Sequence, residues 1–261
     1  GVTQIGGSAF AYSGLTSVTI PGSVTNMGTG VFYDCDNLKT AVLQKGIQSI
    51  KLATFNDCDN LTSVTIPDSV TSIGGGDSYD YGAFGRCTSL TSIAIPASVK
   101  DIGIRAFEGC KSLARVTMPE GVTGIGKSAF NGCSALTSVT IPASVKTIGD
   151  SAFSGCTGLV DVTISDGVIT IGYSAFSGCS SLTSIVIPAS VTTIGSYAFQ
   201  SCSVLTNAKI AEGVPSIGSS AFEKCSGLTN VAIPSSVTNI GEKAFYNCSS
   251  LTSITIPDGV T

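Results

Sequence analysis

The sequence contains no histidine, and only 11% of its 261 residues are charged. Histidine is the usual general base and the usual activator of a serine or cysteine nucleophile, so its absence argues against catalysis. No cluster of lysine and arginine occurs, which argues against nucleic-acid binding. No long uninterrupted apolar run occurs either, so we expect no membrane-spanning helix. The composition therefore favours a binding or structural protein and predicts no cofactor.

Phenylalanine and cysteine reveal an internal repeat. Each of the ten cysteines stands three residues after a phenylalanine, and the last seven intervals between phenylalanines are equal, at twenty-three positions each. A leucine follows six residues after the phenylalanine in every unit from Phe32 onward. The eleven phenylalanines are Phe10, Phe32, Phe55, Phe84, Phe107, Phe130, Phe153, Phe176, Phe199, Phe222 and Phe245.

Each repeat predicts a strand followed by turns. Ile93 and Ile95 alternate with small residues, which is typical of a strand with one buried face. Pro96 cannot donate a hydrogen bond to a neighbouring strand, so it should end this one. Gly103 indicates a turn. The segment Ser151-Ala152-Phe153 predicts a short helical turn that is capped by the serine.

A coil made of a single repeat cannot bury its own apolar side chains, so the repeats must stack. Ten full copies run from Leu15 to Ser250, with partial repeats at 1–14 and 251–261. We therefore expect one solenoid over residues 1–261, cut from a longer protein. Strands about 4.8 Å apart would give a sheet on the order of 50 Å long.

The strand segment Leu-x-x-Ile-x-Ile resembles the leucine-rich-repeat motif, and the whole unit resembles the BspA-like, Treponema-type repeats. That resemblance implies a right-handed, curved α/β-type solenoid, mostly β, with a parallel sheet on its concave side. It also implies an extracellular, cell-surface protein of bacteria or of certain parasitic protists. Members of the family are associated with adhesion to host matrix proteins and to other cells.

One repeat is longer than the others. The copy that begins at Leu61 exceeds the usual length by six positions, and this insertion lies within residues 75–82. A solenoid can loop such an insertion outward. Tyr79 and Tyr81 between glycines and aspartates suit an adaptable contact loop. The alternative is a solvated excursion that contacts no partner.

Four aspartates bracket two successive cysteines: Asp34, Asp36, Asp57 and Asp59. Stacking should bring them together in two rows, where their oxygens could hold Ca²⁺. Calcium normally needs six or more oxygens, so we favour the alternative, in which Arg86 in the next repeat partly offsets Asp57. We accordingly predict no metal site.

The even number of cysteines permits disulfides, and the expected repeat spacing does not exclude them. Every cysteine nevertheless has the same place in its own repeat, and pairing would break that equivalence. We therefore favour buried free thiols, which behave as small apolar side chains.

Residues two and four after each leucine should point outward and form two rows along the concave face. We expect this face to bind an extracellular protein or a glycan, such as host matrix or another cell. The alternative is a passive stalk that displays another domain. The partial repeats should expose apolar side chains, which also predicts end-to-end self-association. The candidate contact residues are Arg115, Thr117, Ser138, Thr140, Asp161, Thr163, Asn207, Lys209, Tyr79 and Tyr81.

Overall fold

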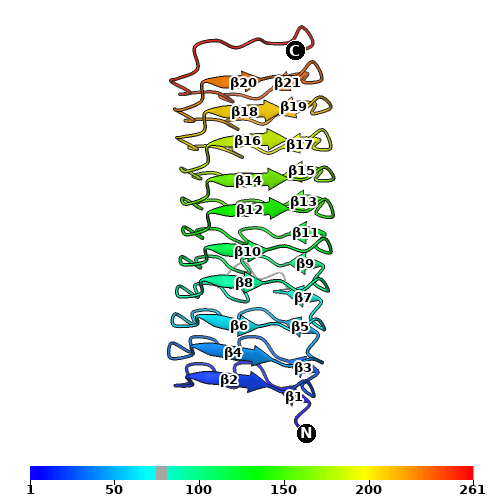
Figure 1. Cartoon of the computed structure of the whole chain (residues 1–261), viewed down its shortest axis with the longest axis vertical. Coiled ribbons are helices and arrows are strands. Elements are labelled where there is room, and N and C mark those ends of the chain that lie inside the picture. The colour runs from blue at the N-terminus through cyan, green and yellow to red at the C-terminus, as the bar shows by residue number, and fades with distance from the viewer. Residues whose placement is uncertain (75–80, 261) are drawn as a thin grey trace.

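In the computed structural model, which describes residues 1–74 and 81–260, the chain forms a stack of similar rungs (Figure 1). Each rung contributes one longer strand, one two-residue strand and a segment of turns. In the view of Figure 1 the stack has little curvature. The predicted leucine-rich-repeat solenoid is confirmed, but none of the described residues is helical, so the fold has no α component there.

The longer strands follow each repeat leucine closely and bury alternate side chains, as the period of two predicts. They are β2 (Ser17–Ile20), β4 (Thr40–Leu43), β6 (Ser63–Thr65), β8 (Ser92–Ala94), β10 (Arg115–Thr117), β12 (Ser138–Ile141), β14 (Asp161–Ile164), β16 (Ser184–Ile187), β18 (Asn207–Ile210) and β20 (Asn230–Ala232).

The two-residue strands end on the isoleucine, or in β3 the methionine, that precedes the repeat glycine or the lysine that replaces it. They are β1 (Gln4–Ile5), β3 (Asn26–Met27), β5 (Ser49–Ile50), β7 (Ser72–Ile73), β9 (Asp101–Ile102), β11 (Gly124–Ile125), β13 (Thr147–Ile148), β15 (Thr170–Ile171), β17 (Thr193–Ile194), β19 (Ser216–Ile217) and β21 (Asn239–Ile240).

All the pairings between these strands are parallel, and they join equivalent positions of successive repeats. The short strands from β5 to β17 form one seven-stranded sheet. In it, Ser72 of β7 pairs with Asp101 of β9 across the insertion, just as Thr147 pairs with Thr170 at the ordinary spacing. The register of the short strands therefore continues across the long repeat.

The third side of each rung contains the phenylalanine and the cysteine. We call it the turn wall and define it as the residues from three before to four after each repeat phenylalanine. In almost every rung the residues two before and two after the phenylalanine have a positive φ, as in Ser128 (55°) and Gly132 (71°) around Phe130. A helix requires negative φ at successive residues. The predicted helical turn is therefore wrong: Ser151, with φ of 54°, is a left-handed residue and not a helix cap.

This alternation directs every second backbone N–H of the turn wall toward the next rung. Ser128, Phe130 and Gly132 donate to carbonyl oxygens of the following rung at 2.7–2.8 Å. The intervening N–H groups, those of Ala129 and Asn131, close tight turns onto carbonyls three residues back in the same rung. The turn wall is thus hydrogen-bonded from rung to rung as regularly as the strands are.

The core is a continuous column of stacked phenylalanine rings. Successive ring centroids lie 5.2–5.5 Å apart and successive ring planes differ by 1–11°. The rings from Phe32 to Phe222 are fully buried. Parallel, offset rings are a favourable arrangement for aromatic pairs. Each interior phenylalanine ring is therefore stabilised by the rings of both neighbouring rungs.

The cysteines do more than fill space. The thiol of Cys133 donates to the carbonyl oxygen of Phe107 at a Sγ–O distance of 3.2 Å, and the equivalent bond recurs in the other rungs. That carbonyl already accepts the N–H of Cys110 in its own rung. All ten thiols are free and buried, in agreement with our interpretation of the sequence.

Glycine is needed where successive rungs approach most closely. A Cβ at Gly149 would lie 2.6 Å from the carbonyl carbon of Gly126 in the rung below. Such a contact is shorter than any that real side chains make, so neighbouring backbones would have to separate. The glycine of the repeated Ile-Gly pair therefore allows successive rungs to approach this closely.

Replacing Phe153 by alanine should lower the free energy of unfolding by about 3–5 kcal/mol, because the substitution leaves a cavity in the ring column. The exposed Ser138→Ala substitution should change it by less than about 0.5 kcal/mol. Equilibrium urea denaturation compares the two variants. Equal losses would show that we have assigned the buried and exposed faces wrongly.

The thiols should not react while the protein is folded. Burial raises the pKa of Cys156 to about 12, so this thiol stays protonated, and the thiolate is the reactive form. Titration with a thiol reagent at pH 8 should be very slow for the native protein and should count all ten cysteines in denaturant. A count near zero in denaturant would instead indicate disulfides.

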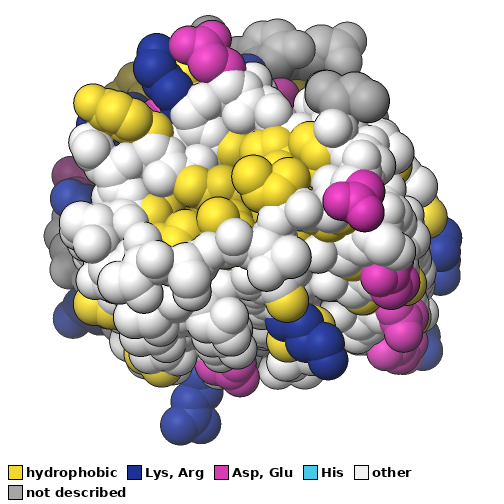
Figure 2. All heavy atoms as spheres, turned by 90° about the horizontal axis from the view of Figure 1, so that it is seen from above, with side chains coloured by type: hydrophobic (Ala, Val, Ile, Leu, Met, Phe, Trp, Pro, Cys, Tyr) yellow, Lys and Arg dark blue, Asp and Glu magenta, His cyan; other side chains and the backbone are white. Residues whose placement is uncertain are grey.

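Both ends of the described stack expose apolar side chains, as expected. Val2 is 61% exposed and Ile256 is 58% exposed. Figure 2 views one end of the stack and shows apolar side chains gathered at its centre. End-to-end self-association remains a prediction. Sedimentation of this chain should show mass increasing with concentration, and a constant monomer mass at high concentration would contradict it.

Candidate functional site

The eight predicted contact residues on the strands lie together on one surface. All of them are exposed, whereas the residues between them point into the core, for example Val116 or Val139. We call this surface the long-strand face and define it as the residues two and four after each repeat leucine. Strand pairing aligns its members, so that Ser138 lies beside Asp161 and Thr140 beside Thr163. Ser184 likewise lies beside Asn207.

The long-strand face is not one uninterrupted sheet. Among the described strands, the ladder is interrupted between β6 and β8, between β10 and β12 and between β14 and β16. A shallow hollow of about 220 Å³ lies at the break between β10 and β12, lined by residues of both strands and by Met118. Three predicted contact residues line it: Thr117, Ser138 and Thr140. The structure therefore places predicted hydroxyl groups around a hollow at this break.

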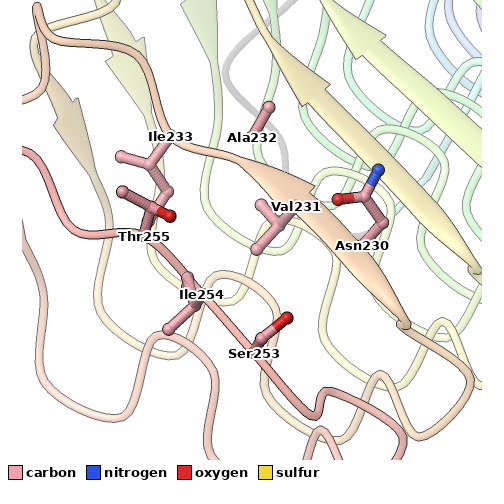
Figure 3. A pocket seen from close by; sticks show the side chains of 7 residues that line it. All are labelled: Asn230, Val231, Ala232, Ile233, Ser253, Ile254 and Thr255. Carbon is pink, nitrogen blue, oxygen red and sulfur yellow. The ribbon is translucent and has the colours of Figure 1, made fainter.

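A second hollow, of about 380 Å³, lies on the long-strand side between β20 and the segment 253–255. Figure 3 shows the side chains that line it, with Asn230 and Val231 from β20 and Ser253 and Ile254 from the following segment. Residues 253–255 lie in the next rung but are not assigned to a strand. The hollow thus lies where β20 and residues 253–255 do not pair as strands.

Large apolar side chains are sparse on the long-strand face. Val42 and Val186 are the exposed large apolar residues in its two rows within the described part of the chain. No aromatic residue occurs in these rows. Charge is sparse as well, with Arg115, Asp161 and Lys209 as examples. The face is therefore a floor of small polar groups with a few charges.

The structure separates Tyr81 from the other predicted contact residues. Its ring packs edge-to-face on Tyr33, with centroids 5.5 Å apart, and Tyr33 packs in the same way on Tyr12. These three rings belong to the turn wall and not to the long-strand face. Tyr79 lies outside the described residues.

Sequence reasoning missed the concentration of tyrosine on the turn wall. Every described tyrosine lies within three residues of a repeat phenylalanine, and Tyr173 packs edge-to-face on Tyr197 further along the stack. Placing each tyrosine in the frame of the repeat would have shown this. The face predicted to bind therefore lacks the aromatic side chains that usually anchor protein interfaces, and the turn wall carries them.

The aspartates also lie on the turn wall. Arg86 forms an ion pair with Asp57 at 3.5 Å, as predicted, and Thr88 donates to Asp59. Desolvation and the neighbouring carboxylates, Asp36 first among them, raise the pKa of Asp34. No group of three or more histidine, cysteine, aspartate or glutamate side chains in the described ranges has the geometry of a metal site.

This arrangement defines a leucine-rich-repeat solenoid with an exposed polar sheet. The chain belongs to the BspA type leucine rich repeat region family, which matches residues 1–76, 77–206 and 169–261. The family resemblance inferred from the repeat is therefore confirmed. No helix of the described residues is long and apolar enough to cross a membrane.

Solved structures show the same fold. A leucine rich cell surface protein of Faecalibacterium prausnitzii is 33% identical, with 96% of this chain and 82% of that one covered and a TM-score of 0.59. A leucine-rich repeat protein of Bacteroides ovatus is 27% identical, with coverages of 96% and 81% and a TM-score of 0.51. The T. pallidum leucine rich repeat protein shares the fold at 24% identity, with coverages of 86% and 82% and a TM-score of 0.53. No curated protein gives a significant match.

Proposed function

We propose that this chain is a cell-surface recognition module that binds an extracellular protein or a glycan through the long-strand face. The observation that carries the proposal is the alignment of exposed polar side chains in two rows over ten strands. Hydroxyl and amide groups in such rows can form many hydrogen bonds with an extended partner. The surface location is supported by the family and by the similar cell surface protein of F. prausnitzii.

The physical character of the face predicts weak binding by a single module. Interface energy usually concentrates in a few aromatic or arginine side chains, and this face offers Arg115 but no aromatic anchor. Several modules that bind one surface together would reach a useful strength through effective concentration. Adhesion is a function that fits such binding.

A structural spacer is the alternative. It is favoured by the recurrence of Ser-x-Thr at the same two exposed positions, for example at Ser138 and Thr140 or Ser253 and Thr255. A uniform polar surface keeps a stalk soluble without binding anything. The charges at Arg115, Asp161 and Lys209 interrupt that uniformity, and they favour recognition.

The test is a screen of matrix proteins and glycans, followed by charge reversal. The double variant Arg115→Glu with Lys209→Glu should weaken binding of a ligand found in the screen by about tenfold or more, since like charges brought together at an interface cost several kcal/mol. The matched control is Lys100→Glu with Lys111→Glu, which makes the same change of net charge at exposed residues outside the long strands and breaks no ion pair seen among the described residues.

Deletion of residues 75–80 separates the contribution of the insertion from that of the sheet. The proposal fails if the Arg115 and Lys209 variant binds as well as the parent while the control variant loses binding. If no ligand is found at any concentration, the spacer function is favoured instead.

A further inference from the structure

The tyrosines of the first rungs enclose a hollow on the turn wall. It has a volume of about 280 Å³. Tyr12, Tyr33 and Tyr81 come from three of the first four rungs and meet edge-to-face. Leu52 and Ala53 add an apolar patch, and two hydroxyl residues add polar groups. The lining residues are Ser8, Tyr12, Thr29, Gly30, Tyr33, Leu52, Ala53 and Tyr81.

The position of the hollow follows from the repeat. Thr29, Leu52 and Tyr81 each stand three residues before a repeat phenylalanine, so they form one column of the stack. Tyr33 stands one residue after Phe32, in a different column, and Tyr81 reaches across to it. The rings remain accessible, since Tyr12 is 72% exposed and Tyr81 is 39% exposed.

Aspartates of the turn wall lie beside the tyrosines, although none of them lines the hollow itself. Asp34 follows Tyr33 directly, and its position in the stack lies between those of Tyr12 and Asp57. Asp57 has partners, because Arg86 pairs with it and the side chains of Asn56 and Tyr33 donate to it. Asp34 and Asp36 form no ion pair within the described ranges of the chain.

The lysine next to the lining residue Leu52 does not supply the missing charge. Lys51 directly precedes Leu52, but its ammonium group donates to the side chain of Asn26 in β3, at 2.9 Å. Its head group therefore lies toward the short strands and away from the tyrosines. Crowding among the four carboxylates also raises the pKa of Asp34 after the larger effect of desolvation, as expected for negative charge without a counterion.

We propose that this hollow binds a basic side chain, arginine or lysine, that a protein partner inserts. The aliphatic stem would lie on Leu52 and Ala53, and the charged head would lie on the tyrosine rings. The aspartates beside Tyr33, of which Asp57 accepts a hydrogen bond from it, would offset the charge. Cations are attracted to the faces of aromatic rings, and arginine does this most often. An anion would be repelled by the carboxylates. A neutral sugar could stack on the rings and donate hydrogen bonds to the carboxylates, but it would leave their negative charge unbalanced. This site is distinct from the long-strand face and does not depend on it.

The test uses a capped Gly-Arg-Gly peptide and its citrulline analogue, which has nearly the same shape without the charge. NMR titration of the full chain should show saturable shifts of the Tyr12, Tyr33 and Tyr81 ring signals with the arginine peptide. The citrulline peptide should bind at least about twofold more weakly, which is the lower end expected from cation–π attraction alone. Added salt should weaken the arginine peptide further.

Asp34→Asn and Tyr12→Ala should each reduce this affinity. The fold should survive both, because asparagine tolerates the left-handed φ of the half-buried Asp34 and Tyr12 is 72% exposed. Tyr173→Ala, in the other tyrosine pair of the turn wall, is the matched control and should have no effect. The Arg115→Glu and Lys209→Glu variant should bind the peptide normally, which separates this proposal from that for the long-strand face. Equal affinity for citrulline, tighter binding of a methyl pyranoside, no binding of the arginine peptide, or indifference to Asp34→Asn would each overturn the proposal.

Discussion

The structure depends on contact between successive rungs, because no single rung can bury its own apolar side chains. The phenylalanine column shows this most directly: each interior ring is covered by the rings of its two neighbours, at centroid distances near 5.3 Å. Hydrogen bonds between rungs on all three sides add direction to this packing. The hydrogen bond from each cysteine thiol to a carbonyl oxygen of the preceding rung adds another contact between rungs. Stability is then a sum of nearest-neighbour terms, as in other solenoids.

That constraint explains which positions of the repeat keep the same residue from rung to rung and which positions vary. Positions that touch the next rung repeat with little change, such as the glycine at 149 that lies against Gly126. Outward positions carry no such requirement, so they can vary without cost to the stack. Residues as different as Arg115, Ser138 and Asp161 occupy the same position of successive strands. Any binding specificity of this protein must therefore lie in the outward positions.

The sequence predicted the strands and the core well, because both follow from a simple periodicity. Alternation around Ile93 and Ile95 indicated a half-buried strand, and Ile93 is indeed buried in β8. The turn wall could not be predicted in the same way. Ser151 is an ordinary helix cap by residue type, and its left-handed φ is selected by hydrogen bonds to the next rung that local sequence does not specify.

The candidate site was predicted in part for a related reason. Alternation within a strand sufficed to place Thr140 and Thr163 side by side on an exposed surface. The place of Tyr81 depends on packing across columns, against Tyr33 in an earlier rung, and a pattern within one repeat carries no such information. The resulting division into a polar long-strand face and a tyrosine-bearing turn wall emerges only from the assembled stack.

Native-state hydrogen exchange tests the central claim, that the turn wall is hydrogen-bonded from rung to rung as the strands are. The amides of Phe130 and Gly132 donate to the next rung, although they lie in a segment without strand or helix. We predict that they exchange as slowly as the amides of β13 and β15, which lie inside the seven-stranded sheet, because both must wait for rungs to separate. Exchange of these turn-wall amides at the rate of an open loop, with the strands still protected, would contradict the account.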